Sequence, residues 1–83
     1  MKTAALQQME IGLMAKFHQN PKLRDFLLAT GECILAEASP HSKFWGTGIG
    51  LGDPLLKDES AWTGQNKLGE LLTKVRTSLK KNN

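Results

Sequence analysis

The sequence predicts a single, mainly α-helical domain of the α+β class, with three helices, a long glycine-rich loop and at most short strands. Apolar residues recur at three- and four-residue spacing near both ends of the 83-residue chain, which is the period of one helix face. Between them, residues 39–66 hold five of the eight glycines and two of the three prolines. A chain of this length supports one domain at most, so we assign residues 1–83 to one.

The first helix is predicted over residues 4–17, ending near Gln19, because its apolar residues form one stripe: Leu6, Met9, Leu13, Met14 and Phe17. The second begins at Asn20-Pro21, since asparagine caps free amides and proline is favoured at the first helical position. Gly31 is a natural stop for it. We expect its buried face to consist of Leu23, Phe26 and Leu27.

The third helix is predicted from about Lys67 to Lys80, with a buried stripe made of Leu68, Leu71, Leu72, Val75 and Leu79. Residues 33–38 (CILAEA) are a brief segment with some β propensity, which Ser39-Pro40 ends. Loops as long as residues 39–66 tend to be functional or disordered. Trp45 and Trp62 argue for an ordered loop, because large aromatic surfaces normally pack on something.

Composition favours a soluble, cytoplasmic protein. Cys33 is the single cysteine, so no disulfide forms within the chain, which weakly favours a reducing compartment. The sequence has neither a signal-peptide pattern nor an apolar run of the roughly 20 residues needed to span a bilayer. The net charge is +3: residues 67–81 sum to +4, and the rest of the chain sums to −1. That excess either touches nucleic acid or, more simply, complements a helix C-terminus in solvent.

The four alternating glycines of residues 46–52 do not form a nucleotide loop. The dinucleotide fingerprint Gly-x-Gly-x-x-Gly fails on spacing, and the Gly-Lys-Ser/Thr of a Walker loop is absent. Two interpretations stay open. Glycines let backbone approach a flat ligand beside Trp45, or the stretch is a surface turn with a core tryptophan.

Other chemistry-bearing residues give weaker signals. His18, Cys33 and His41 match no structural zinc spacing, so no metal site is predicted. The acids of the central region are Glu37, Asp53, Asp58 and Glu59, and two acids facing one pocket can share acid and base roles. Glu37 stands in an otherwise apolar segment, where it is either functional or held by loop amides for structural reasons.

Three blocks of the sequence together resemble the C-terminal half of the NADAR, or YbiA-like, domain family. They are AKFHQNPKLRDFLLATG, LAEASPHSKFWGTGIG and WTGQNKLGELLTKVR, in the family's order and at about its spacing. The resemblance covers the chain from about Ile11 to Arg76, and its combined motifs are highly specific.

The resemblance implies an α+β fold dominated by helices and hydrolysis of a ribose–base N-glycosidic bond. Members act on ribosylamino-pyrimidines or on ADP-ribosylated bases, so nucleic acid enters only as a modified substrate. No cofactor is implied, and the ligand is a nucleoside- or ADP-ribose-like molecule. We expect Glu37 and Asp53 to be catalytic, and the ligand to be bound by Ser39, Trp45, Gly46, Trp62 and Asn66.

The sequence departs from the family pattern in two ways. The motifs of the family's N-terminal half are absent, and Ser42 stands where the family often has a catalytic aspartate. The chain alone is therefore predicted to be inactive: either it is a truncated product, or another polypeptide supplies the missing half. The alternatives are a non-catalytic ADP-ribose- or nucleotide-binding module and a truncated remnant.

Overall fold

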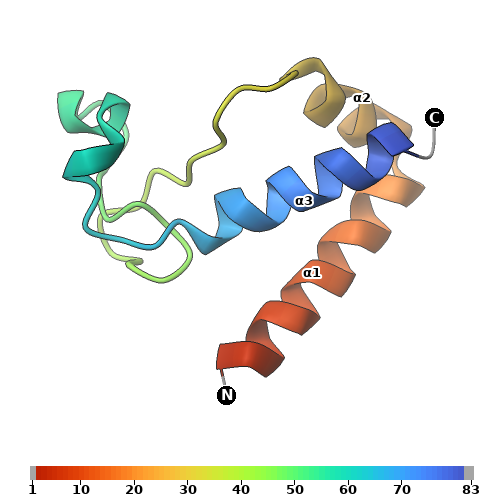
Figure 1. The fold of residues 1–83 in the computed structure, drawn as a ribbon, viewed down its shortest axis with the longest axis horizontal. Helices are drawn as coiled ribbons and strands as arrows, with labels where there is room; N and C mark the ends of the chain where they lie inside the picture. The colour runs from red at the N-terminus through yellow and green to blue at the C-terminus, as the bar shows by residue number, and fades with distance from the viewer. Residues whose placement is uncertain (1, 82–83) are drawn as a thin grey trace. The chain divides into compact units, whose positions relative to one another are not determined.

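A computed structural model describes residues 2–81, with three α-helices and two short 3-10 helices among them (Figure 1). These residues fall into two compact units: residues 2–33 with 71–81, and residues 34–70. The first unit contains helices α1 (Lys2–Gln19) and α2 (Pro21–Ala29). Helix α3 (Lys67–Lys81) begins in the second unit and continues into the first. The mainly helical prediction is confirmed.

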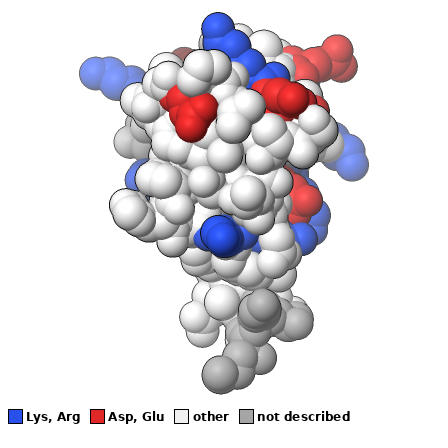
Figure 2. Space-filling model, turned by 90° about the vertical axis from the view of Figure 1, so that its left-hand side faces the viewer, with Lys and Arg blue, Asp and Glu red and all other residues white. Residues whose placement is uncertain are grey.

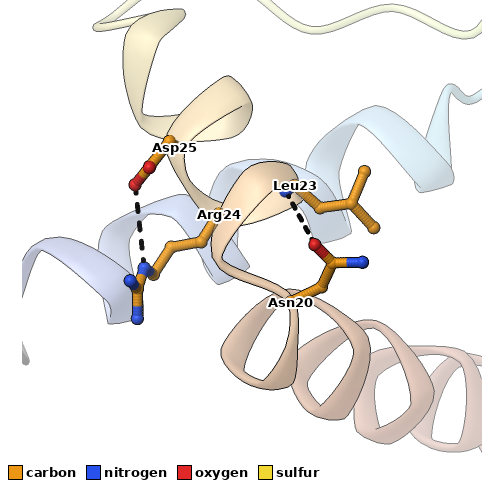
Figure 3. A network of polar contacts seen from close by, with 4 residues as sticks. All are labelled: Asn20, Leu23, Arg24 and Asp25. Carbon is orange, nitrogen blue, oxygen red and sulfur yellow. Dashed lines mark hydrogen bonds and ion pairs between the residues drawn. The ribbon is translucent and has the colours of Figure 1, made fainter.

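The start of α2 follows directly from its sequence (Figure 3). Asn20 is the N-cap, and its side-chain Oδ1 accepts a hydrogen bond of 3.2 Å from the backbone N–H of Leu23. Pro21 occupies the first helical turn, where its missing N–H is not needed. Arg24 and Asp25 form a long ion pair of 3.9 Å beside this turn. The predicted start of this helix is therefore confirmed.

Helix α2 ends at Ala29, and its C-cap comes one residue before Gly31, the predicted stop. Thr30 is the C-cap, and its hydroxyl donates to the carbonyl of Leu27. Gly31 follows with a φ of 63°, in the left-handed region that glycine adopts without strain. Its N–H donates to the carbonyl of Leu28 at 3.1 Å, so the turn satisfies a carbonyl that the ending helix leaves free.

Two basic residues of α3 bond the turn that follows α2. Arg76 is buried at 6% exposure, and its Nη1 donates to Thr30 Oγ1 at 2.8 Å and to the Cys33 carbonyl at 2.9 Å. Lys80 Nζ donates to the carbonyl of Gly31 at 3.2 Å. Positive charge is favourable where helix carbonyls point outward, so these contacts account for part of the C-terminal excess of charge.

The apolar core of the first unit is small. Leu27 of α2 is buried, as are Leu71, Val75 and Leu79 of α3. The other two residues of the predicted α3 stripe, Leu68 and Leu72, are half-buried. Phe26 differs from the prediction, since it is 74% exposed instead of lying on the buried face of α2. Periodicity identifies an apolar side of a helix but does not show that another element covers it.

The second unit contains no strand within residues 34–70. The segment with β propensity, residues 33–38, has no regular structure, because no neighbouring strand pairs with it in the described chain. The loop contains the 3-10 helices η1 (Pro54–Lys57) and η2 (Glu59–Ala61). Their N-caps are Asp53 and Asp58, whose carboxylates accept from Leu55 N at 2.9 Å and Ser60 N at 3.1 Å.

Replacing the α2 cap should destabilise the chain measurably. Asn20→Ala removes the acceptor for Leu23 N–H and should lower the free energy of unfolding by about 1 kcal/mol. In a domain of this size that shift lowers the melting temperature by about 4–8 °C. Thermal denaturation followed by circular dichroism measures it. Gln19→Ala, at an exposed neighbouring position, is the control, and equal melting temperatures for the two variants would contradict the capping role.

Candidate functional site

A buried asparagine organises the second unit. Asn66 is 7% exposed, and its carboxamide makes two hydrogen bonds to one distant segment. Nδ2 donates to the carbonyl of Leu35 at 2.8 Å, and Oδ1 accepts from the N–H of Glu37 at 2.9 Å. A carbonyl and an amide two residues apart are what a neighbouring β-strand would bond. The side chain of Asn66 therefore takes the place of a strand partner for residues 35–37.

The backbone around Asn66 joins a second segment to the start of α3. The N–H groups of Asn66, Lys67 and Leu68 donate to carbonyls of residues 44–46 at 2.8–3.0 Å. The acceptors are, in that order, Gly46, Phe44 and Trp45. The first N–H groups of a helix have no partner within it, and this loop supplies one for two of them. Those two amides are thus satisfied by the chain's own carbonyls.

Two glycines permit this crossing of backbones. A Cβ on Gly64 would collide with the carbonyl oxygen of Gly46 and lie 2.8 Å from the carbonyl carbon of Thr47. A Cβ on Gly69 would collide with the carbonyl of Leu35 and lie 2.5 Å from Asn66 Nδ2. Both close contacts involve groups that cannot easily move, so only glycine fits at either position.

Gly46, a predicted ligand-binding residue, is buried within the same crossing. A Cβ there would lie 2.9 Å from the Ser42 carbonyl oxygen, 3.0 Å from Ser39 Cβ and 3.1 Å from the Glu37 carbonyl oxygen. The space that the missing Cβ of Gly46 leaves is therefore filled by other residues of the same chain.

Thr47 is the most deeply buried polar residue of the unit, at 0% exposure. Its backbone N–H and its hydroxyl both donate to the carbonyl of Glu37, at 2.9 and 3.0 Å. The hydroxyl oxygen also accepts from the N–H of Ile49 at 3.2 Å, and the Ile49 carbonyl, at 3.2 Å, is a second acceptor for the hydroxyl hydrogen. Sequence reasoning missed Thr47, and its one signal is a small hydroxyl residue flanked by glycines.

Two serine hydroxyls shape the turn that leads to Trp45. Ser39 Oγ accepts from Ser42 N–H, and Ser42 Oγ accepts from Trp45 N–H, each at 3.2 Å. Accepting these bonds leaves each hydroxyl hydrogen available to donate elsewhere. Ser39, Trp45 and Gly46 are thereby brought into one short turn next to Glu37.

The two tryptophans are half-buried in different surroundings. The ring of Trp45 packs edge-on against Phe44, with centroids 4.8 Å apart and an interplanar angle of 82°. Trp62 donates from Nε1 to the carbonyl of Leu56 at 2.9 Å, which ties it to η1. Trp62 thus anchors the two 3-10 helices, while Trp45 belongs to the turn beside Glu37.

The two predicted catalytic acids differ in how the chain uses them. The backbone of Glu37 is bonded on both sides, by Asn66 and by Thr47, and Glu37 as a whole is half-buried. Within the described residues its carboxylate makes no hydrogen bond or ion pair. Asp53 is exposed, and its carboxylate caps η1. The hydrogen-bond network places Glu37 with Ser39, Trp45, Gly46 and Asn66, and does not include Asp53 or Trp62.

The surface and the metal-binding potential add few constraints. The face in Figure 2 is largely uncharged, with both acidic and basic side chains on it, so it has no continuous patch of one sign. Over residues 2–81, no three histidine, cysteine or acidic residues cluster as a metal site would require. Among the described helices, none combines the length and the apolar character that crossing a membrane requires.

Comparison with known proteins identifies the family. The model of the NADAR domain matches residues 2–80, which is nearly the whole chain. The chain belongs to the NADAR domain family. The resemblance read from the three sequence blocks is thereby confirmed.

Several curated relatives are similar in sequence to this NADAR chain. N-glycosidase R617 of Acanthamoeba polyphaga mimivirus is 43% identical over 65 residues, covering 78% of this chain and 38% of the relative. Protein irg-1 of Caenorhabditis elegans is 44% identical over 66 residues, covering 80% and 31%. N-glycosidase YbiA of Escherichia coli K12 is 38% identical over 73 residues, covering 88% and 39%.

This NADAR chain spans between 31% and 39% of the length of these three relatives. No solved structure matches it.

The backbone crossing predicts that alanine at Gly64 destabilises the chain, whereas alanine at a glycine outside the crossing does not. Gly64→Ala should lower the free energy of unfolding by about 1–3 kcal/mol, because the added methyl group meets fixed backbone. Gly12→Ala is the matched control, since it lies in α1 with nothing within 4 Å of its Cβ position. There alanine should stabilise the helix by up to about 1 kcal/mol. Urea denaturation measures both, and a neutral Gly64→Ala would contradict the close approach.

Proposed function

We propose that this NADAR chain carries part of an N-glycosidase site that hydrolyses a ribose–base N-glycosidic bond. The substrate is a ribosylamino-pyrimidine or an ADP-ribosylated base. The family match and two relatives named N-glycosidases support this class of reaction. One observation assigns this reaction to a particular residue: the backbone of Glu37 is held by hydrogen bonds on both sides, while its carboxylate bonds no other part of the chain.

The chemistry suits a carboxylate in that position. Cleaving the bond between ribose and a base builds positive charge on the sugar ring, and a fixed negative charge nearby stabilises that transition state. Glu37 is the stronger candidate for this role, because Asp53 is exposed and already caps η1. Asp53 would act as the second acid of the pair, through the carboxylate oxygen that Leu55 does not use.

The ligand contacts follow from the same turn. Trp45 would stack on the flat base, and the free hydroxyl hydrogens of Ser39 and Ser42 would donate to ligand oxygens. Gly46 would support the ligand site indirectly, because its missing Cβ lets Ser39, Ser42 and the Glu37 carbonyl pack closely around the turn. Asn66 has one lone pair and one amide hydrogen left for a ligand, because Leu35 and Glu37 use the others. Trp62 would contribute an apolar face from the 3-10 helices.

Ser42 bears on whether the chain is active by itself. It stands where the family often has an aspartate, and its Oγ accepts the Trp45 N–H that an aspartate would also accept. Serine therefore keeps the turn and omits the charge.

A second polypeptide segment would complete the site. The chain spans only 31–39% of three of its relatives, and several large apolar residues are exposed: Ile11, Phe26, Ile34, Leu51 and Leu55. Where such residues lie together, they are typical of a surface that a partner covers.

The alternative is a non-catalytic module that binds ADP-ribose or a nucleotide. Ser42 favours it, because the turn beside Trp45 is retained without the charge that hydrolysis would use.

Substrate cleavage tests the proposal directly. A ribosylamino-pyrimidine and an oligonucleotide with an ADP-ribosylated guanine are each incubated with the chain together with the polypeptide segment that completes the site, and the released base is measured by chromatography. Glu37→Gln should reduce release by about 100-fold or more, since it removes the charge and keeps the shape. Ser42→Asp should increase release, because it restores a carboxylate without losing the bond to Trp45 N–H.

Controls separate the proposed function from its alternative. Glu32→Gln makes the same change at an exposed acid outside this unit and should leave release unchanged. Calorimetric titration with ADP-ribose measures binding without chemistry. Binding with no release, even in Ser42→Asp, would favour the binding module. Neither binding nor release, with the proposed partner segment also present, would contradict both functions.

A further inference from the structure

The two buried polar residues of the range 34–70, Thr47 and Asn66, both bond the backbone of Glu37. The carbonyl of Glu37 accepts from Thr47 N, Thr47 Oγ1 and Ser39 N at 2.9–3.0 Å. The N–H of Glu37 donates to Asn66 Oδ1 at 2.9 Å. Both peptide groups that flank the Glu37 side chain are therefore held, and by residues up to 29 positions away.

The two residues that hold Glu37 are themselves fixed. Thr47 is fully buried, and its hydroxyl oxygen also accepts from Ile49 N–H, so it has little freedom to rotate. Asn66 bonds Leu35 with the other end of its carboxamide, which prevents the amide group from turning over. A collision between Leu35 and any side chain at position 69 is avoided because that residue is glycine.

The Glu37 carboxylate does not itself join this network. Fixing the backbone of a residue restricts the directions that its side chain can take, because rotamers depend on the local φ and ψ. A catalytic carboxylate must be held in a defined direction by supporting residues whose own positions are locked. We propose that Thr47 and Asn66 are positioning residues, which act through the backbone of Glu37 to aim its carboxylate at the sugar of the substrate.

This inference rests on the proposed function for the identity of the substrate, but the aiming of Glu37 can be measured without one. Side-chain three-bond couplings in the isotope-labelled 83-residue chain report whether Glu37 occupies one χ1 rotamer or several. Thr47→Val removes the hydroxyl and keeps the branched shape, and it keeps the backbone bond to Glu37. Thr47→Ser keeps the hydroxyl and is the matched rescue.

We expect one dominant Glu37 rotamer in the parent chain and in Thr47→Ser, and averaged couplings in Thr47→Val. Residues of α1 should give unchanged spectra in all three chains, which separates a local effect from general unfolding. A parent chain with averaged couplings, or a Thr47→Val chain with the parent's couplings, would overturn the inference. If Thr47→Val does not fold, Thr47→Ser decides, since averaged couplings in that variant would also overturn it.

Kinetics supply a second readout on any preparation that releases base. Thr47→Val should lower kcat by about 10-fold with KM little changed, because misaiming an acid weakens the transition state more than substrate binding. An equal rise in KM with unchanged kcat would contradict a positioning role. Failure of the proposed function would be seen as unchanged release in Glu37→Gln, while the rotamer comparison would still test the role of Thr47 by itself.

Discussion

The carboxamide of Asn66 is the interaction on which the second unit depends. Its two hydrogen bonds reach a carbonyl and an N–H two residues apart, as an adjacent strand would. Backbone groups that are partly shielded from water need hydrogen-bond partners, and residues 34–38, which are half-buried or exposed, have no neighbouring strand to supply them. The side chain of Asn66 supplies these partners from a distant part of the sequence. Asn66 itself has a φ of 50°, a left-handed conformation that asparagine tolerates better than most residues.

The glycine-rich stretch has a structural explanation that does not require a ligand. The close passage of Gly64 over residues 46–47 brings backbone against backbone, and the carbonyls of residues 44–46 bond the N–H groups of residues 66–68. The glycines do let backbone come close, but to another segment of the same chain, and the tryptophan beside them is half-buried. A ligand would meet the turn of Ser39 to Trp45, at the edge of this crossing.

Local features were predictable from the sequence, and the site was largely not. The cap at Asn20, Pro21 after it, and the stripe containing Leu71, Val75 and Leu79 depend on residues within a few positions of each other. Phe26 shows the limit of periodicity, since an apolar face is covered only if another element lies over it.

The long-range contacts of the candidate site left no local signal. Asn66 and Glu37 were both predicted as site residues, but the bond between them spans 29 positions. Thr47 was missed because a buried hydroxyl looks the same in sequence as an exposed one. The family match does not single out either acid, and the hydrogen bonds then distinguish Glu37, whose carboxylate the chain leaves unused, from Asp53, which caps a 3-10 helix.

Amide hydrogen exchange of Glu37 tests the central claim most directly. If Asn66 substitutes for a strand partner, the Glu37 N–H exchanges slowly in the parent chain, and Asn66→Ala accelerates that exchange far more than exchange in the middle of α1. Exchange of the Glu37 amide at the rate of an unstructured peptide in the parent chain would contradict the account.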